Sequence, residues 1–391
     1  MVGLSLTTEL ELPAIGPVRR RGGDGGGGGL SSKWRAGKRV AEMGFNAGGG
    51  AVNWFPGHMA AAARAIRHRL KLADLVIEVR DARIPLSSAN GELQCLLASK
   101  RRVIALNKKD LANPNIMHHW IRHFESCKQD CLSINAHSRS SVSQEVISRE
   151  PTLLVMVVGV PNVGKSALIN SIHRIATSRF PVQEKVKRAT VGPLPGVTQD
   201  IAGYKIANQP SIYVLDTPGV LVPSIPDMET GLKLALTGAV KDSVVGEERL
   251  AQYLLAILNS RKTPLHWERL VNVRTERSGH ESHDSNEPIF SNSLPRRRRQ
   301  LDNSDVLYIE DLAKEVQKTL YLTFKDFEGN KEEESELESL IDMQLMALRK
   351  AFRILHKASD EARTMVSKKL LTLFRIGKLG PFILDSIPNS P

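Results

Sequence analysis

Cysteine is scarce in this sequence, and long hydrophobic runs are missing. The 391 residues include only three cysteines, Cys95, Cys127 and Cys131, and their spacing forms no zinc-binding pattern. This small, odd number argues against a disulfide framework and favours a reducing compartment. The longest apolar run, Leu153 to Val160, is far shorter than the roughly 20 residues that a helix needs to cross a bilayer. We therefore expect no membrane-spanning segment, and any membrane contact would be peripheral.

Acidic residues are outnumbered by basic ones. Lys and Arg number 54 against 42 Asp and Glu, which gives a formal net charge of +12. This excess favours a polyanionic partner such as nucleic acid or an acidic membrane surface, although plain solubility would also explain it. Apolar residues make up 41% of the chain. The chain can therefore bury a sizeable core, and its length predicts two domains plus some unstructured sequence.

The composition divides the chain into five stretches. Residues 1–50 contain glycine and arginine runs and few large apolar side chains, so we expect a disordered tail. Its composition fits a transit peptide poorly, because transit peptides contain few acidic residues and this tail includes Glu9 and Asp24. The remaining stretches predict an α/β domain over 51–222, a helical connection over 223–270, a disordered basic insertion over 271–305 and a helical domain over 306–391.

Five short β-branched segments predict a parallel sheet with helices between the strands. Each is followed by a polar or glycine turn, and in doubly wound folds the chemistry lies at these carboxyl ends of the strands. The predicted strands are Leu75–Val79, Val103–Leu106, Leu132–Ile134, Leu153–Val158 and Ile212–Leu215.

A glycine-rich loop follows the fourth predicted strand and precedes a helical segment over 167–172. Its residues are Gly159, Val160, Pro161, Asn162, Val163, Gly164, Lys165 and Ser166. Strand, loop and helix in this order are typical of a P-loop, in which backbone N–H groups, including that of Ala167, cradle phosphates. In such a loop Lys165 reaches the β and γ oxygens and Ser166 ligates Mg²⁺. The alternative is a chance glycine turn with a surface lysine.

Three further motifs fit a nucleotide site that is selective for guanine. Asp216, which ends the fifth predicted strand, would hold Mg²⁺ through water, and the N–H of Gly219 would meet the γ-phosphate. Thr198 lies 32 residues after Ser166 and 18 before Asp216, the position of a switch threonine for Mg²⁺ and the γ-phosphate. The run Asn107, Lys108, Lys109 and Asp110 ends the second predicted strand and resembles the guanine-selective N-K-x-D motif, with Asn135 and Ala136 in the base-side loop.

The order of these motifs is permuted. In ordinary GTPases the P-loop precedes N-K-x-D, whereas here the N-K-x-D motif at 107 precedes the P-loop at 159. Together the motifs resemble those of the circularly permuted GTPases of ribosome assembly, in the mitochondrial GTPase 1 branch related to bacterial ribosome biogenesis GTPase A. Two further segments, Asn53–Met59 and Asp81–Pro85, are similar to this branch, and they resemble those of its plant members, called DAR GTPases. The resemblance covers about residues 52 to 390.

The resemblance implies what this chain does. It implies hydrolysis of GTP to GDP and phosphate, with Mg²⁺, coupled to late maturation of the large ribosomal subunit and contact with its rRNA. It also implies a mitochondrial matrix location, with contact at the inner face of the inner membrane left open and a chloroplast as the alternative. One departure is the segment 135–152, which is short for the helix that relatives have there.

The motifs also raise questions about catalysis. Val220 occupies the place where many GTPases have the glutamine that orients the attacking water. The resemblance makes His58 the catalytic candidate, together with Lys165 and Thr198, and makes Asn162 a ligand for K⁺. The alternatives are that His58 only packs and that Asn162 only forms a turn. We interpret Arg83 as a structural residue, and an arginine finger is the speculative alternative.

The predicted C-terminal helix runs from an N-cap at Ser359 to a stop at Gly377. Its apolar residues share one face, which leaves Lys368, Lys369 and Arg375 on a basic outer face that would bind rRNA by analogy with the family.

Three functions stay open. The first is a GTPase that assembles the organellar large subunit, and the second is a GTP-gated RNA-binding scaffold with negligible hydrolysis. The third is an ATP-using P-loop enzyme, which the N-K-x-D motif argues against.

Overall fold

The computed structural model describes residues 40–47, 52, 54–138, 152–179, 189, 191, 200–208, 211–223, 225, 227–272, 303–354 and 359–388. Most of the predicted tail, the short connection over 139–151, Thr198 and most of the predicted basic insertion lie outside these residues. Within the described part, no helix is both long enough and apolar enough to span a bilayer.

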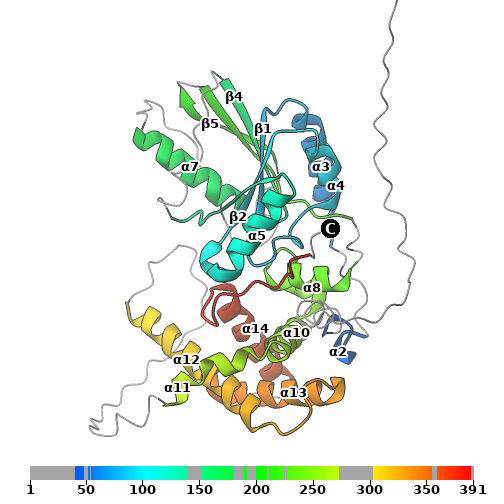
Figure 1. The fold of residues 1–391 in the computed structure, drawn as a ribbon, viewed down its shortest axis with the longest axis vertical. Helices are drawn as coiled ribbons and strands as arrows, with labels where there is room; N and C mark the ends of the chain where they lie inside the picture. Colours follow the sequence, from blue (N-terminus) through cyan, green and yellow to red (C-terminus); the bar gives the residue numbers. More distant parts are fainter. Residues whose placement is uncertain are drawn as a thin grey trace, which may run out of the picture.

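A six-stranded sheet forms the upper half of the molecule (Figure 1). Its strands are β1 (Leu75–Asp81), β2 (Arg102–Asn107), β3 (Asp130–Ser133), β4 (Thr152–Val158), β5 (Ala202–Asn208) and β6 (Ser211–Asp216), and they lie in the order β3-β2-β1-β4-β6-β5. Every neighbouring pair is parallel except β5 and β6. The predicted α/β fold with a permuted motif order is therefore confirmed, because the N-K-x-D strand β2 precedes the P-loop strand β4.

Alternating side chains of the central strands pack against helices on both faces of the sheet. Val76 on β1 packs with buried residues of α3 (Gly57–Leu70) and α4 (Gly91–Leu97). The next residue, Ile77, faces the other way, into the cluster that contains Leu168 of α7 (Lys165–Arg179). On β2, Ile104 and Leu106 pack against α5 (Pro114–Ser126). This period of two is the alternation expected of a strand that is buried on both faces.

Below the sheet lies a helical region (Figure 1). It comprises α8 (Met228–Leu236), α9 (Asp242–Val245), α10 (Glu247–Ser260), η2 (Thr263–Trp267), α11 (Arg269–Asn272), α12 (Asn303–Asp326), α13 (Glu334–Ala351) and α14 (Ser359–Arg375). The central helix is α10, whose Leu250, Leu254 and Leu258 are all buried. Its Asn259 exchanges two hydrogen bonds, of 2.8 and 2.9 Å, with Gln344 of α13. The stretch predicted as a helical connection is thus helical, and its α10 packs against α13.

Part of the expected N-terminal tail is also folded. Residues 40–47 include buried Val40 and Met43 and the short helix α2 (Gly44–Ala47). The N–H of Gly44 donates to Glu334 Oε1 at 2.9 Å, and that of Phe45 donates to Glu338 Oε1 at 3.2 Å. The expectation of disorder up to residue 50 is therefore wrong for 40–47. Two carboxylates almost 300 residues away accept hydrogen bonds from this helix, and no local pattern announces them.

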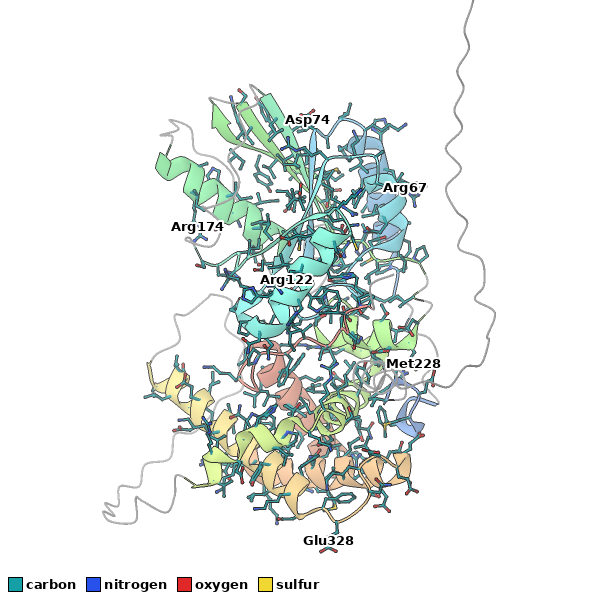
Figure 2. All side chains as sticks on the ribbon, in the orientation of Figure 1. Arg67, Asp74, Arg122, Arg174, Met228 and Glu328 are labelled. Atoms are coloured by element: carbon teal, nitrogen blue, oxygen red, sulfur yellow. The ribbon has the colours of Figure 1, made fainter. Side chains whose placement is uncertain are left out.

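The carboxyl ends of the parallel strands point toward the helical region. Asp74, which precedes β1, lies at the far end of the sheet in Figure 2, so β1 runs toward the helices and ends at Asp81. At the C-terminus, α14 begins at Ser359, the residue predicted as its N-cap, and ends at Arg375, after which Gly377 has the left-handed φ of 78° that is typical of a helix end. Any ligand held at this edge of the sheet therefore lies between the sheet and the helices.

Candidate active site

The P-loop connects β4 to α7 at the centre of this edge. Lys165, in the first turn of α7, is buried, and its Nζ donates to the carbonyl oxygens of Gly159 at 3.2 Å and Val160 at 2.9 Å. Burial lowers the pKa of Lys165 to about 8, although the charge of Asp216 opposes this change. The ammonium group thus occupies the hollow of the loop, where phosphate oxygens would replace the two carbonyls as its partners.

Ser166 and Asp216 lie next to this lysine. Ser166 Oγ donates to Asp216 Oδ2 at 2.7 Å. Burial raises the pKa of Asp216, against the opposing effects of the Ser166 hydrogen bond and of Lys165. The other oxygen, Oδ1, is buried and has no hydrogen-bond partner among the described residues. A hydroxyl beside a buried carboxylate with a free oxygen fits a Mg²⁺ site that is completed by phosphates and water.

Asn107 joins the P-loop to the predicted base-side loop. It ends β2, is buried, and its Nδ2 donates to the carbonyl of Val163 at 2.8 Å. Its Oδ1 accepts the N–H of Ala136 at 2.9 Å. Gly164 makes this contact possible, because a Cβ at that position would collide with Asn107 Nδ2, and its φ of 94° also disfavours a side chain. One amide therefore links the P-loop to the predicted base-side loop.

The rest of the N-K-x-D motif follows in the 3₁₀ turn η1 (Lys109–Leu111). Lys108 precedes it with a left-handed φ of 64°, and the N–H of Lys109 donates to Ile134 O at 3.1 Å. Asp110 is exposed. The oxygen Asn135 Oδ1 accepts the N–H of His137 at 2.9 Å, which shapes the loop beside it. The structure thus brings the predicted base-side residues to one edge of the sheet, next to the P-loop.

The segment after Asp216 turns back against the P-loop. Thr217 Oγ1 donates to Val157 O at 2.7 Å, and a Cβ on Gly219 would collide with the backbone of Pro161. Val220 is 1% exposed and packs among α3 and α4 with Phe55, while its carbonyl accepts Asn90 Nδ2 at 2.8 Å. Its buried side chain cannot orient a water molecule at the nucleotide.

Comparisons with known proteins agree with this geometry. A family model described as a 50S ribosome-binding GTPase matches residues 154–279. Short integuments 2, mitochondrial, from Arabidopsis thaliana is 65% identical over 361 residues, 90% of this chain and 93% of that protein. DAR GTPase 2, mitochondrial, from the same plant is 38% identical over 351 residues, 85% and 90% of the two chains. The chain belongs to the DAR GTPase family. Ribosome biogenesis GTPase A of Priestia megaterium is 37% identical over 227 residues, 54% of this chain and 74% of that protein.

In this DAR GTPase the Asp81-Ala82-Arg83 segment contacts the predicted N-K-x-D motif. Arg83 is 2% exposed, its Nη2 lies 2.8 Å from Asp81 Oδ2, and the ammonium of Lys108 lies 3.0 Å from the same oxygen. Burial would raise the pKa of Asp81, but the charges of Arg83 and Lys108 outweigh it and hold that pKa well below its usual range. The speculative reading of Arg83 as an arginine finger is wrong, because this buried ion pair keeps the guanidinium inside the protein.

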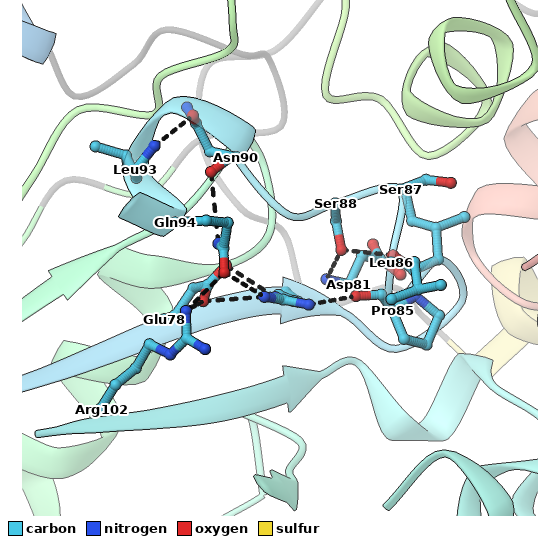
Figure 3. Close-up of polar contacts among 12 residues, drawn as sticks. Glu78, Asp81, Pro85, Leu86, Ser87, Ser88, Asn90, Leu93, Gln94 and Arg102 are labelled. Carbon is cyan, nitrogen blue, oxygen red and sulfur yellow. Dashed lines mark hydrogen bonds and ion pairs between the residues drawn. The ribbon is translucent and has the colours of Figure 1, made fainter. Parts of the chain in front are cut away.

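A second buried pair fixes the start of the same turn (Figure 3). Arg80 Nε donates to Glu78 Oε1 at 2.8 Å, and Arg80 Nη1 donates to Pro85 O at 3.1 Å. Gln94 of α4 and Arg102 of β2 close the network around Glu78, where Gln94 Nε2 donates at 3.0 Å and the ion pair to Arg102 measures 3.3 Å. This network could not be predicted from the sequence, because its members come from three different elements.

The helical region contacts the P-loop and the turn after β1. Asn162 of the P-loop, at a φ of 58°, donates through Nδ2 to Gly238 O at 3.3 Å, in the turn after α8. The C-terminal segment crosses the turn after β1, where Asp385 Oδ2 accepts the N–H groups of Leu86 and Ser87 at 2.8 and 2.9 Å. Sequence reasoning missed Asp385, because an isolated carboxylate near a chain end carries no pattern.

We predicted Arg375 on the basic outer face of α14, but in the structure it binds the neighbouring helices. Arg375 donates to Ala235 O and Leu236 O, both at 2.9 Å, and pairs with Asp242 at 2.6 Å. It therefore caps the last carbonyl groups of α8 and holds α9. Lys369 Nζ donates to Phe352 O at 3.3 Å, and Lys368 Nζ lies 3.5 Å from Glu247. Arg375 and Lys369 therefore bind the protein itself, whereas Lys368 stays exposed beside Glu247.

Proposed function

We propose that this GTPase hydrolyses GTP to GDP and phosphate as an assembly factor for the mitochondrial large ribosomal subunit. The observation that carries the nucleotide assignment is the bridge by Asn107 between Val163 of the P-loop and Ala136 of the base-side loop. The ribosomal assignment is supported by the matching 50S ribosome-binding GTPase model. The mitochondrial assignment is supported by the names of both plant relatives.

The proposed roles follow from the positions of the residues. Backbone N–H groups of the P-loop and Gly219 would bind the phosphates, Lys165 would exchange its two carbonyl partners for phosphate oxygens, and Asp110 would accept hydrogen bonds from the guanine edge. Ser166 and Asp216, with Thr198 as the predicted switch residue, would hold Mg²⁺. The ion would supply positive charge where negative charge develops on the transferred phosphoryl group. Before the ion binds, the Ser166–Asp216 hydrogen bond keeps both side chains in position.

Hydrolysis is expected to need a partner. Because the side chain of Val220 is buried in a hydrophobic cluster, the intrinsic rate should be low, and purified large ribosomal subunits should raise it. Hydrolysis of GTP by the full chain, measured with and without subunits in K⁺ and then in Na⁺ buffer, tests this. Faster turnover in K⁺ would support Asn162 as the cation ligand, and equal rates would contradict that role. GTP-dependent subunit binding without stimulation would favour the RNA-binding scaffold, for which the buried Val220 is the specific argument.

We further propose that His58 orients the attacking water. It is exposed in the first turn of α3, and Phe55, three residues earlier, packs in the same cluster as Val220. His58→Ala should lower the rate of hydrolysis about 100-fold, the lower end of the usual contribution of such a group, with GTP affinity unchanged. His118→Ala, at an exposed histidine of α5, is the control. Single-turnover rates for His58→Ala equal to those of the wild type, with and without subunits, would refute the role.

A further inference from the structure

Helix α3 presents a basic face that contains no acid. Among its residues Gly57–Leu70 there is no Asp or Glu, while Arg64, His68 and the following Lys71 lie at i, i+4 and i+7 on the side opposite the buried residues. All three are exposed, and so is Arg69. Figure 2 shows Arg67 of the same helix at the outer margin of the molecule. The helix thus carries a stripe of positive charge along its solvent side.

The cations of this stripe differ from those of α14. Within the described residues, the side chains of Arg64, Arg69 and Lys71 have no ion-pair partner. On α14 and just after it, four cations lie instead beside acids of the same protein: Lys368 beside Glu247, Arg363 beside Glu248 and Asp342, Arg375 beside Asp242 and Lys378 beside Glu310. The cations of the α3 stripe therefore lack the acidic partners that these four have.

Capping of the helix does not account for this charge. Cations near a helix C-terminus are often explained by its free carbonyl groups. Here Lys100, from another part of the chain, donates its ammonium to Lys71 O at 3.0 Å and to Ala73 O at 3.2 Å. Arg64 lies in the middle of the helix, away from that end. The stripe is thus available to an external polyanion.

We propose that the outer face of α3 binds the phosphate backbone of ribosomal RNA. This inference rests on the proposed function, and it names the surface of that function. A row of cations with no acid among them fits a backbone of phosphates, which carries negative charge at regular intervals. The first turn of the same helix contains His58, and Met59 beside it is fully buried. RNA bound along α3 is therefore connected through one rigid helix to the group proposed to act on the water, which provides a route for stimulation by the subunit.

The test compares two double variants of the full chain with equal charge change. Arg64→Gln with Lys71→Gln removes two cations from α3, whereas Arg122→Gln with Lys350→Gln removes two exposed cations from α5 and α13. Binding to large ribosomal subunits and to a short A-form RNA duplex is measured over a range of salt concentrations. Loss of two phosphate contacts should weaken binding about 30-fold near 0.15 M salt and make the log–log salt slope shallower by about 2. The control variant should behave like the wild type.

Each outcome has a defined meaning. A shallower salt slope for the α3 variant only, with either probe, supports the proposal. A shallower slope with the RNA duplex supports it even if the subunits fail to stimulate hydrolysis and the proposed function is thereby refuted. Equal slopes for the two variants overturn it, as does a wild type that binds neither probe. Binding of the wild type to anionic vesicles with no binding to RNA also overturns it, in favour of a membrane surface. Unchanged basal hydrolysis in the α3 variant shows that its active site is intact.

Discussion

Substitution of Gly164 by alanine is expected to lower the affinity for GTP more than 100-fold. Gly164 has a φ of 94°, where a side chain is strained, and a Cβ would collide with Asn107 Nδ2. Asn107 would then have to move, which breaks its hydrogen bonds to Val163 O at 2.8 Å and from Ala136 N at 2.9 Å. Phosphate side and base side would lose their alignment together, so the loss corresponds to about 3 kcal/mol or more of binding free energy.

Titration with a fluorescent GTP analogue measures this effect. The matched control is Gly91→Ala at the start of α4, where an added Cβ meets nothing within 4 Å. Because alanine also favours the helix over glycine, this control should bind GTP with wild-type affinity and be slightly more stable. Wild-type affinity in a folded Gly164→Ala variant would show that the Asn107 bridge does not align the site.

Replacement of Asp81 by asparagine is expected to remove about 3 to 5 kcal/mol from the free energy of unfolding. Asp81 is 1% exposed, and its carboxylate faces both Arg83 and Lys108. A neutral amide would leave the guanidinium of Arg83 buried without a counter-charge, and Arg83 Nη1 already has no hydrogen-bond partner among the described residues. Because total stabilities are commonly about 5 to 15 kcal/mol, the variant should be marginally stable.

Urea unfolding near neutral pH measures the loss, and Asp130→Asn, at an exposed carboxylate that starts β3, is the control expected to stay within about 0.5 kcal/mol of the wild type. The pKa of Asp81 is lowered in the folded state. Its contribution is therefore fully present above the unfolded pKa of about 3.9 and declines as the pH falls below that value. The difference between wild type and Asp81→Asn should shrink accordingly in acid. A loss below about 1 kcal/mol at neutral pH would contradict the role of Asp81 as the counter-charge.

The second prediction also concerns nucleotide binding. Lys108 belongs to the N-K-x-D motif, and Asp81 holds its ammonium at 3.0 Å. The residues are adjacent in space because β1 and β2 pair in parallel, with Asp81 opposite Asn107. Destabilisation of the turn after β1 should therefore disturb the N-K-x-D motif before the rest of the site. Weaker GTP binding by Asp81→Asn at a temperature where it is fully folded would show this coupling.

Local motifs in the sequence were enough to predict the residues of the candidate site and the order of its parts. Each nucleotide motif follows a short apolar strand, and parallel strands bring their carboxyl ends to one edge. The positions of Lys165, Ser166 and Asp216 could be predicted for this reason, since each depends on residues within its own motif. The strand β5 could not, because its sequence has no apolar run and it pairs antiparallel at the edge of the sheet.

Which cations have an acidic partner could not be predicted from the sequence, because it depends on the packing of the folded chain. Arg375 and Lys368 looked like an outer face on a helical pattern, yet Arg375 pairs with Asp242, 133 residues away, and Lys368 with Glu247. On α3, no acid of the described chain lies within ion-pair distance of Arg64 or Lys71. A local pattern gives the face of a helix on which a charge lies. The partner of that charge depends on contacts between residues far apart in the chain, which form only when the sheet and the helices pack together.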